Sequence, residues 1–182
     1  MAEKLNRQDW IDRALRMLAL SGVETVRVEP LAKALGVTKG SFYWHFRDRT
    51  ALLEAMLDAW RERTTDAVIE HVEAAGGDAP TRLASLFRLT VQSEGRLERA
   101  IRSWAATDEA ARAALAGVDA RRIGYLLRLF QEIGLSPEAA LSRARLAYLA
   151  LIGQYMIKAD QPDWLAESLD EIVPMMTRPL AG

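Results

Sequence analysis

Hydrophobic residues recur at helical spacing along most of the chain, and glycine, proline and capping residues separate the segments. After Asn6, a good N-cap, Trp10, Ala14 and Leu18 fall at i, i+4 and i+8 and form one apolar stripe. Asp48 and Ser136 also precede helical patterns as N-caps. No useful length of the chain alternates as a strand does. The pattern predicts an all-α fold of about nine helices, with helices expected over residues 7–20, 28–35, 39–45, 48–74, 81–93, 95–106, 108–133, 137–159 and 162–176.

Composition narrows the classes of function. The 182 residues carry a net charge of −1, so any nucleic-acid binding must come from a local patch. The absence of cysteine excludes disulfides and thiolate chemistry, and only two histidines, His45 and His71, are present for a metal. We expect a cytoplasmic protein with no cofactor, no metal and no membrane partner, because no signal peptide or apolar span is present.

The segment from Leu31 to Thr38 predicts two helices joined by a tight turn. Gly36 ends the first helix, and Thr38 is placed to cap the second. Two helices joined so closely cross at a wide angle, which projects the second helix outward. Leu31, Leu35 and Val37 are expected to form the small core that fixes this angle.

The second of these helices has the composition of a recognition helix. Phe42 and Phe46, at i and i+4, are expected to face inward, which leaves small, polar and amphipathic side chains outside: Lys39, Gly40, Ser41, Tyr43, Trp44 and His45. A short exposed helix of this kind suits a DNA major groove. The alternative is an ordinary helical corner with an aromatic core, which occurs in many all-α proteins.

Local charge favours the nucleic-acid interpretation. Between Thr25 and Thr50, five basic residues stand against two acidic ones, a local net charge of +3 in a chain that is slightly acidic as a whole. The excess of positive charge lies in the segment that would contact DNA phosphates.

The same segment resembles the TetR family of bacterial transcriptional regulators. The resemblance rests on Leu31-Ala32, Gly36-Val37-Thr38, the run from Gly40 to Phe46, Arg49 and Leu52-Leu53, and covers about residues 8–55. It implies a three-helix DNA-binding domain over residues 1–48 and a helical ligand-sensing and dimerisation domain over residues 49–182. It also implies a set of DNA-contacting residues: Arg27, Thr38, Lys39, Gly40, Ser41, Tyr43, Trp44, His45 and Arg49.

Two positions depart from the family pattern. Arg49 stands where the family usually has lysine, and a phosphate contact survives that exchange. Arg27 stands where the family often has Thr or Ser, so it cannot cap a helix through a hydroxyl, although a phosphate contact is still expected.

The resemblance also gives expectations for the rest of the chain. A small apolar or amphipathic effector would bind among aromatic residues of the middle helices, although aromatics at helical spacing are more often core: Trp60, Phe87, Trp104, Tyr125, Phe130, Tyr148 and Tyr155. A homodimer would form through the segments near 137–159 and 162–176, of which the first is apolar nearly all round. That helix could instead lie at the centre of its own bundle.

Together with the resemblance, these features predict a transcriptional repressor that binds a palindromic operator on double-stranded DNA as a homodimer. The resemblance implies that a small ligand releases it. An enzyme is not expected, because no catalytic motif is present and His45 lies in the DNA element. The alternatives are a ligand-independent DNA-binding dimer with a filled body, or an activator.

Overall fold

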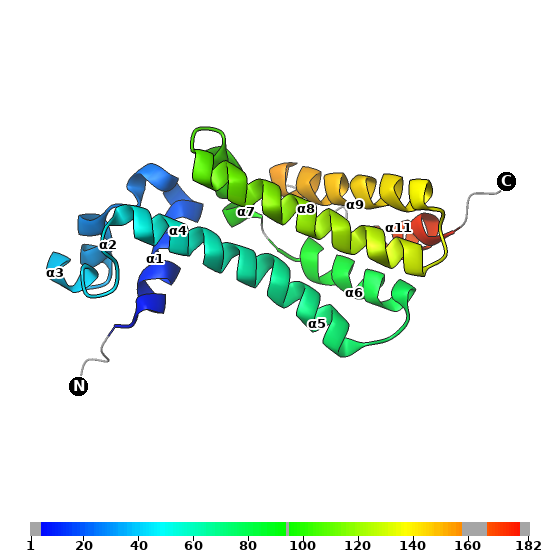
Figure 1. The fold of residues 1–182 in the computed structure, drawn as a ribbon, viewed down its shortest axis with the longest axis horizontal. Coiled ribbons are helices and arrows are strands. Elements are labelled where there is room, and N and C mark those ends of the chain that lie inside the picture. Colours follow the sequence, from blue (N-terminus) through cyan, green and yellow to red (C-terminus); the bar gives the residue numbers. More distant parts are fainter. Residues whose placement is uncertain (1–4, 94, 158–166, 179–182) are drawn as a thin grey trace. The chain divides into compact units, whose positions relative to one another are not determined.

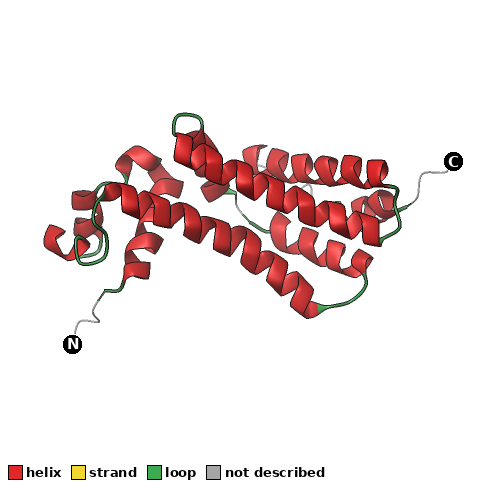
Figure 2. Ribbon diagram, viewed as in Figure 1, coloured by secondary structure: helices red, strands yellow, loops and turns green. Residues whose placement is uncertain are grey.

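The computed structural model describes residues 5–93, 95–157 and 167–178, and every regular element in these ranges is helical (Figure 2). The predicted all-α class is confirmed. None of the described helices is long and apolar enough to cross a membrane. The first half of the chain contains α1 (Arg7–Ser21), α2 (Val28–Ala34), α3 (Lys39–Phe42), α4 (Arg49–Arg61), α5 (Ala67–Ala75) and α6 (Ala79–Val91). The second half contains α7 (Arg96–Ala105), α8 (Glu109–Glu132), α9 (Pro137–Ile157) and α11 (Leu169–Thr177).

Side-chain caps define several helix starts. Asn6 Oδ1 accepts hydrogen bonds from the amides of Gln8 and Asp9 at 2.7 and 3.1 Å, and Asp9 accepts in return from the Asn6 amide at 2.7 Å. This reciprocal pair satisfies amides that have no partner inside the helix. Asp48 caps α4 through the Ala51 amide at 2.8 Å. Ser136 accepts from the Ala139 amide at 3.3 Å at the start of α9, so the caps predicted at these three residues are confirmed.

The chain forms two compact units, and each is built from segments distant in sequence. The first contains Met1–Glu62 and Arg96–Ala116. Here α1 packs on α2, α4 and α7 (Figure 1). Its largest fully buried side chains include Trp10, Leu31, Phe42, Met56, Trp60 and Ile101. By packing, α4 and α7 therefore lie with the N-terminal helices, whereas the functional boundary expected after residue 48 stays a prediction.

The second unit contains Arg63–Gly95 and Gly117–Gly182. Within it, α6 packs against α5, α9 and α11. One apolar core joins these helices with the C-terminal half of α8, through residues such as Val72, Leu83, Leu129, Phe130 and Ala144.

The long helix expected over 48–74 is interrupted at its middle. After α4, the residues Glu62–Asp66 form a wider π-helical turn before α5 begins. Arg122 of α8 supports this turn by donating to the Thr65 hydroxyl at 2.9 Å and the Thr64 hydroxyl at 3.0 Å. A wider turn leaves backbone groups without their ordinary helical partners, and Arg122 also approaches the Thr64 carbonyl at 3.4 Å.

Candidate nucleic-acid interface

A sharp turn separates α2 from α3. Gly36 adopts a φ of +70°, which L side chains rarely take, and the Val37 amide donates back to the Ala32 carbonyl at 3.0 Å. Leu31 and Ala32 are buried beneath the turn, with Leu35 and Val37 partly buried. The predicted pair of short helices is confirmed, although the second ends at Phe42 and not at His45.

The prediction that Thr38 caps α3 through its side chain is wrong. Thr38 occupies the N-cap position, but its hydroxyl accepts no capping hydrogen bond. The Ser41 amide, which such a cap would bind, donates instead to the backbone carbonyl of Thr38 at 3.0 Å. The exposed hydroxyl of Thr38 is therefore not used in holding the helix.

Two phenylalanines anchor α3 and the turn that follows it. Phe42 is fully buried and Phe46 nearly so, as predicted. The Phe42 ring meets Trp10 of α1 edge-on at 5.4 Å between centroids and stacks on Phe46 at the same distance. Regular α-helix ends at Phe42, and the hydrogen bonds from Tyr43 to Gly40 and from His45 to Phe42 continue the turn to His45.

The opposite face of α3 is open. Trp44 is 87% exposed and Tyr43 54% exposed, values that are unusual for large aromatic side chains. Lys39 and Gly40 are exposed too, whereas Ser41 and His45 are partly buried. Four residues of the predicted contact set, Lys39, Gly40, Tyr43 and Trp44, are therefore exposed on α3 and the turn that follows it.

Lys39 has a partner that the sequence reasoning did not identify. Its ammonium forms an ion pair with Glu29 of α2 at 2.8 Å. This hydrogen bond raises the pKa of Lys39 and lowers the pKa of Glu29. Lys39 therefore keeps its positive charge, and its side chain lies across the turn between the two helices.

The two arginines that depart from the family pattern bind backbone carbonyls. Arg27 is the N-cap of α2 without a side-chain cap bond, and its Nε donates to the Glu24 carbonyl at 2.9 Å. Arg49 lies at the start of α4 and donates to the carbonyls of Val26 and Val23 at 2.7 and 3.0 Å.

The seven aromatic residues predicted to line a ligand site are divided between the two units. Trp60 and Trp104 are buried in the first unit, whereas Phe87, Tyr125, Phe130, Tyr148 and Tyr155 lie in the second. Three tyrosine hydroxyls already donate hydrogen bonds within the second unit. Tyr125 donates to Glu73 at 2.6 Å and Tyr148 donates to Asp119 at 2.5 Å. Tyr155 donates to the Thr90 carbonyl at 2.8 Å.

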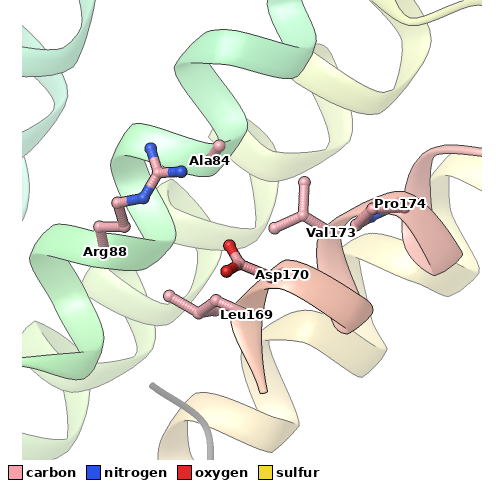
Figure 3. A pocket seen from close by; sticks show the side chains of 6 residues that line it. All are labelled: Ala84, Arg88, Leu169, Asp170, Val173 and Pro174. Carbon is pink, nitrogen blue, oxygen red and sulfur yellow. The ribbon is translucent and has the colours of Figure 1, made fainter. Parts of the chain in front are cut away.

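A cavity of about 190 Å³ lies between α6 and α11 in the second unit (Figure 3). Arg88 and Asp170 supply its charged groups, and the remaining lining is apolar: Ala84, Leu169, Val173 and Pro174. None of the seven predicted aromatic residues lines it. Spacing along single helices could not indicate this cavity, because it depends on how α11 packs on α6.

A short helix held by a sharp turn, with basic and aromatic side chains outside and phenylalanines behind, defines the class of helix-turn-helix DNA-binding proteins. Residues 11–56 match the family described as bacterial regulatory proteins, tetR family. This part of the chain is therefore similar to the DNA-binding segment of TetR-family transcriptional regulators.

Individual relatives agree with this assignment. The HTH-type transcriptional regulator AcrR of Shigella flexneri is 30% identical over 93 residues, 51% of this chain and 43% of AcrR. The class D tetracycline repressor of Escherichia coli is 38% identical over 53 residues, 29% of this chain and 24% of that protein. The matched part of the chain thus spans less than half the length of these curated relatives.

The likeness to solved structures extends over nearly the whole chain. The reduced form of NemR from E. coli covers 96% of this chain and 99% of its own, with a TM-score of 0.80 and 20% identity. At this identity the likeness establishes the fold of the TetR type.

Proposed function

We propose that this protein is a DNA-binding transcriptional regulator that reads a palindromic operator as a homodimer. The observation that carries the proposal is the outward side of α3 and of the turn after it, where Tyr43 and Trp44 are exposed and the buried phenylalanines anchor the segment from behind. A helix presented in this way fits a major groove, and its amphipathic side chains can reach base edges and phosphates.

The local charge supports phosphate binding at the edge of this helix. Lys39 is exposed at the start of α3, and Arg27 is exposed at the start of α2. Phosphate contacts fix the position of the protein on the duplex, whereas base contacts supply the sequence preference. We therefore assign Lys39 and Arg27 to positioning, and Tyr43, Trp44 and His45 to base recognition, with Thr38, Gly40 and Ser41 lying close to the backbone.

The homodimer is proposed from an apolar face of α9. Leu146 is 59% exposed and Leu149 is 66% exposed, and Met156 and Ile157 continue the same stripe. Small residues of α8 are also exposed, among them Gly117, Ala120 and Gly124, and they would allow close approach of another helix. A two-fold interface pairs such a surface with itself and removes it from water.

The second segment expected at the interface, 162–176, is described only from residue 167. There α11 buries Leu169 and Met176 within its own unit and exposes Met175. Residues 158–159 and 162–166 lie outside the described residues. We therefore propose that α9 and α8 form most of the dimer interface.

The regulatory part of the proposal is repression relieved by a small apolar or amphipathic effector bound in the second unit. Such an effector shifts the equilibrium away from the DNA-bound conformation only if it binds the DNA-free conformation more tightly. A ligand-independent dimer, or an activator, is the alternative. A thermal-shift screen with apolar metabolites separates a sensor from a ligand-independent dimer, because a ligand that binds the native state raises its melting temperature.

The DNA-binding proposal is tested with a variant that carries both Lys39→Ala and Tyr43→Ala. Both side chains are exposed, so the variant should keep the helical content and oligomeric state of the parent. Its affinity for a short labelled duplex should fall by about 100-fold, since two recognition contacts are removed.

Arg88→Ala is the matched control, because it removes one exposed positive charge from the second unit. It should leave the affinity for the duplex near that of the parent. The proposal is wrong if the double variant binds DNA as the parent does, and the exposed-face argument is wrong if the double variant loses its helicity.

A further inference from the structure

The start of α2 lacks the side-chain cap that short helices usually need. This helix has seven residues, and Arg27 at its N-cap position has no side-chain oxygen to accept the first amides. The Arg27 guanidinium points backward to the Glu24 carbonyl instead. Because α2 carries α3 through the turn at Gly36, its position has to be fixed by other contacts.

Arg49 makes two contacts at this place. Its Nε donates to the Val26 carbonyl at 2.7 Å and its Nη2 donates to the Val23 carbonyl at 3.0 Å. Both carbonyls belong to the 3₁₀ turn Val23–Thr25 and the buried Val26 that follows it, directly before α2. The contacts join segments that are 23 and 26 residues apart in sequence.

The chemistry of the side chain suits this role. A guanidinium carries donors in a rigid fork, so two carbonyls can be bound at once, whereas a lysine has one nitrogen on a flexible stem. A cation at the first residue of α4 gains nothing from the helix dipole, which favours negative charge there. The two carbonyls supply the favourable interaction that the helix end does not.

We infer that Arg49 is a positioning residue for the helix-turn-helix: it clamps the turn before α2 onto the start of α4 and so fixes the position of a helix start that has no side-chain cap. This role rests on the proposed DNA binding, and it replaces the phosphate contact expected for Arg49 from the sequence. Loss of the clamp loosens the start of α2, and the recognition helix α3 loses its fixed position with it.

The test compares Arg49→Lys, which keeps the charge and loses the fork, with Arg49→Ala, which loses both. The first readout is hydrogen exchange of the Val26 and Leu31 amides in the full chain. Both variants should exchange about tenfold faster than the parent, because each removes a forked, charge-assisted pair of hydrogen bonds. Parent-like protection in both variants would overturn the inference.

The second readout is the salt dependence of binding to a short mixed-sequence duplex. A phosphate contact contributes about 0.9 to the slope of log K against log salt. Under the clamp, Arg49→Ala leaves this slope unchanged, although affinity falls in both variants. A slope reduced by about 0.9 in Arg49→Ala but not in Arg49→Lys would show a phosphate contact and overturn the inference. Lys39→Ala is the control that lowers the slope.

A rescue variant separates the clamp from simple loss of packing. Arg27→Thr places a hydroxyl at the start of α2 that can accept a hydrogen bond from the Glu29 amide. Arg27→Thr with Arg49→Ala should therefore recover part of the lost protection at the Leu31 amide. No recovery would contradict the inferred compensation. The exchange readout needs no DNA, so a parent that fails to bind the duplex would refute the proposed function and leave the clamp still measurable.

Discussion

At the scale of single residues, Gly40 is a position where folding and function favour different side chains. A Cβ added at this position would meet only the Thr38 hydroxyl oxygen, at 3.7 Å, which is ordinary contact. Glycine inside a helix is less stable than alanine, so internal packing does not account for the residue. The proposed DNA binding accounts for it, because a residue without a side chain lets the DNA backbone come close.

Gly40→Ala should therefore have opposite effects on folding and on binding. The free energy of unfolding should rise by about 0.5 kcal/mol, because alanine loses less backbone entropy in a helix. Affinity for a duplex should fall, because the methyl group stands between the helix and the DNA. Urea denaturation and fluorescence anisotropy measure the two effects. Unchanged affinity would mean that DNA does not approach this side of α3.

Sequence was informative about residues whose role is local. Phe42 and Phe46 follow from their spacing, and Trp44 follows as the side chain left outside. The ion pair of Lys39 with Glu29 was not predicted, because it depends on the crossing of α2 and α3. The Thr38 side-chain cap was predicted wrongly for a local reason: the Ser41 amide donates to the backbone carbonyl of Thr38 and not to its hydroxyl.

At the scale of elements, a polar cluster holds the second unit together. Glu73 of α5 accepts from Tyr125 of α8 at 2.6 Å and from Arg82 of α6 and Arg128 of α8 at 3.0 Å. Arg82 also binds Glu132. The hydrogen bond from Tyr125 is the main cause that lowers the pKa of Glu73 below its ordinary value of 4.5.

This shift fixes the sign of a pH dependence. A carboxylate whose pKa is lowered by folding contributes stability above the unfolded value, here 4.5, and the contribution is lost as pH falls through the folded pKa. Tyr125→Phe removes the hydrogen bond that is the main cause of the lowered Glu73 pKa. The unfolding free energy of this variant should be about 1 kcal/mol below that of the parent at neutral pH. The difference from the parent should shrink below pH 4.5.

Tyr155→Phe is the matched control for this prediction. Its hydroxyl donates to the Thr90 backbone carbonyl, which does not titrate, so the loss should be the same at acid and neutral pH. Thermal unfolding over a pH series gives both profiles. Identical pH profiles for the two variants would contradict a stabilising role of the Glu73 charge.

Helix boundaries followed from the sequence where a neighbouring residue sets them. Asn6, Asp48 and Ser136 cap as predicted, because each bond closes within three residues. The wider turn at Glu62–Asp66 was not predicted. It is stabilised by a hydrogen bond from Arg122, which lies 57 residues from Thr65. Helical periodicity cannot indicate a partner so distant in sequence.

At the scale of the whole molecule, the exposed face of α9 predicts a dimer that one charge can disrupt. Leu149→Glu should yield a monomer in analytical ultracentrifugation, because two carboxylates would face each other across a two-fold seam. Leu20→Glu is the control, since Leu20 is similarly exposed, at 71%, but lies on α1. A parent protein that is monomeric at micromolar concentration would refute the dimer.

The arrangement of the whole molecule was less accessible to sequence reasoning than its helices. Trp60 and Trp104 were grouped with the tyrosines as candidate ligand contacts, yet they pack in the first unit. Spacing gives the face of a helix on which a residue lies, but not the helix that covers that face. The helix α7 belongs to the first unit because it packs against α1. It follows α6 in the chain, so its place in the sequence gives no sign of this contact.

The central claim is that two copies of α3 read a symmetric DNA site. Selection of bound duplexes from a random-sequence pool, with the full chain, tests it most directly. The account predicts enrichment of a palindrome whose half-site centres are about one helical turn, roughly 34–36 Å, apart. Recovery of DNA without sequence preference, or of a single asymmetric site, would contradict it.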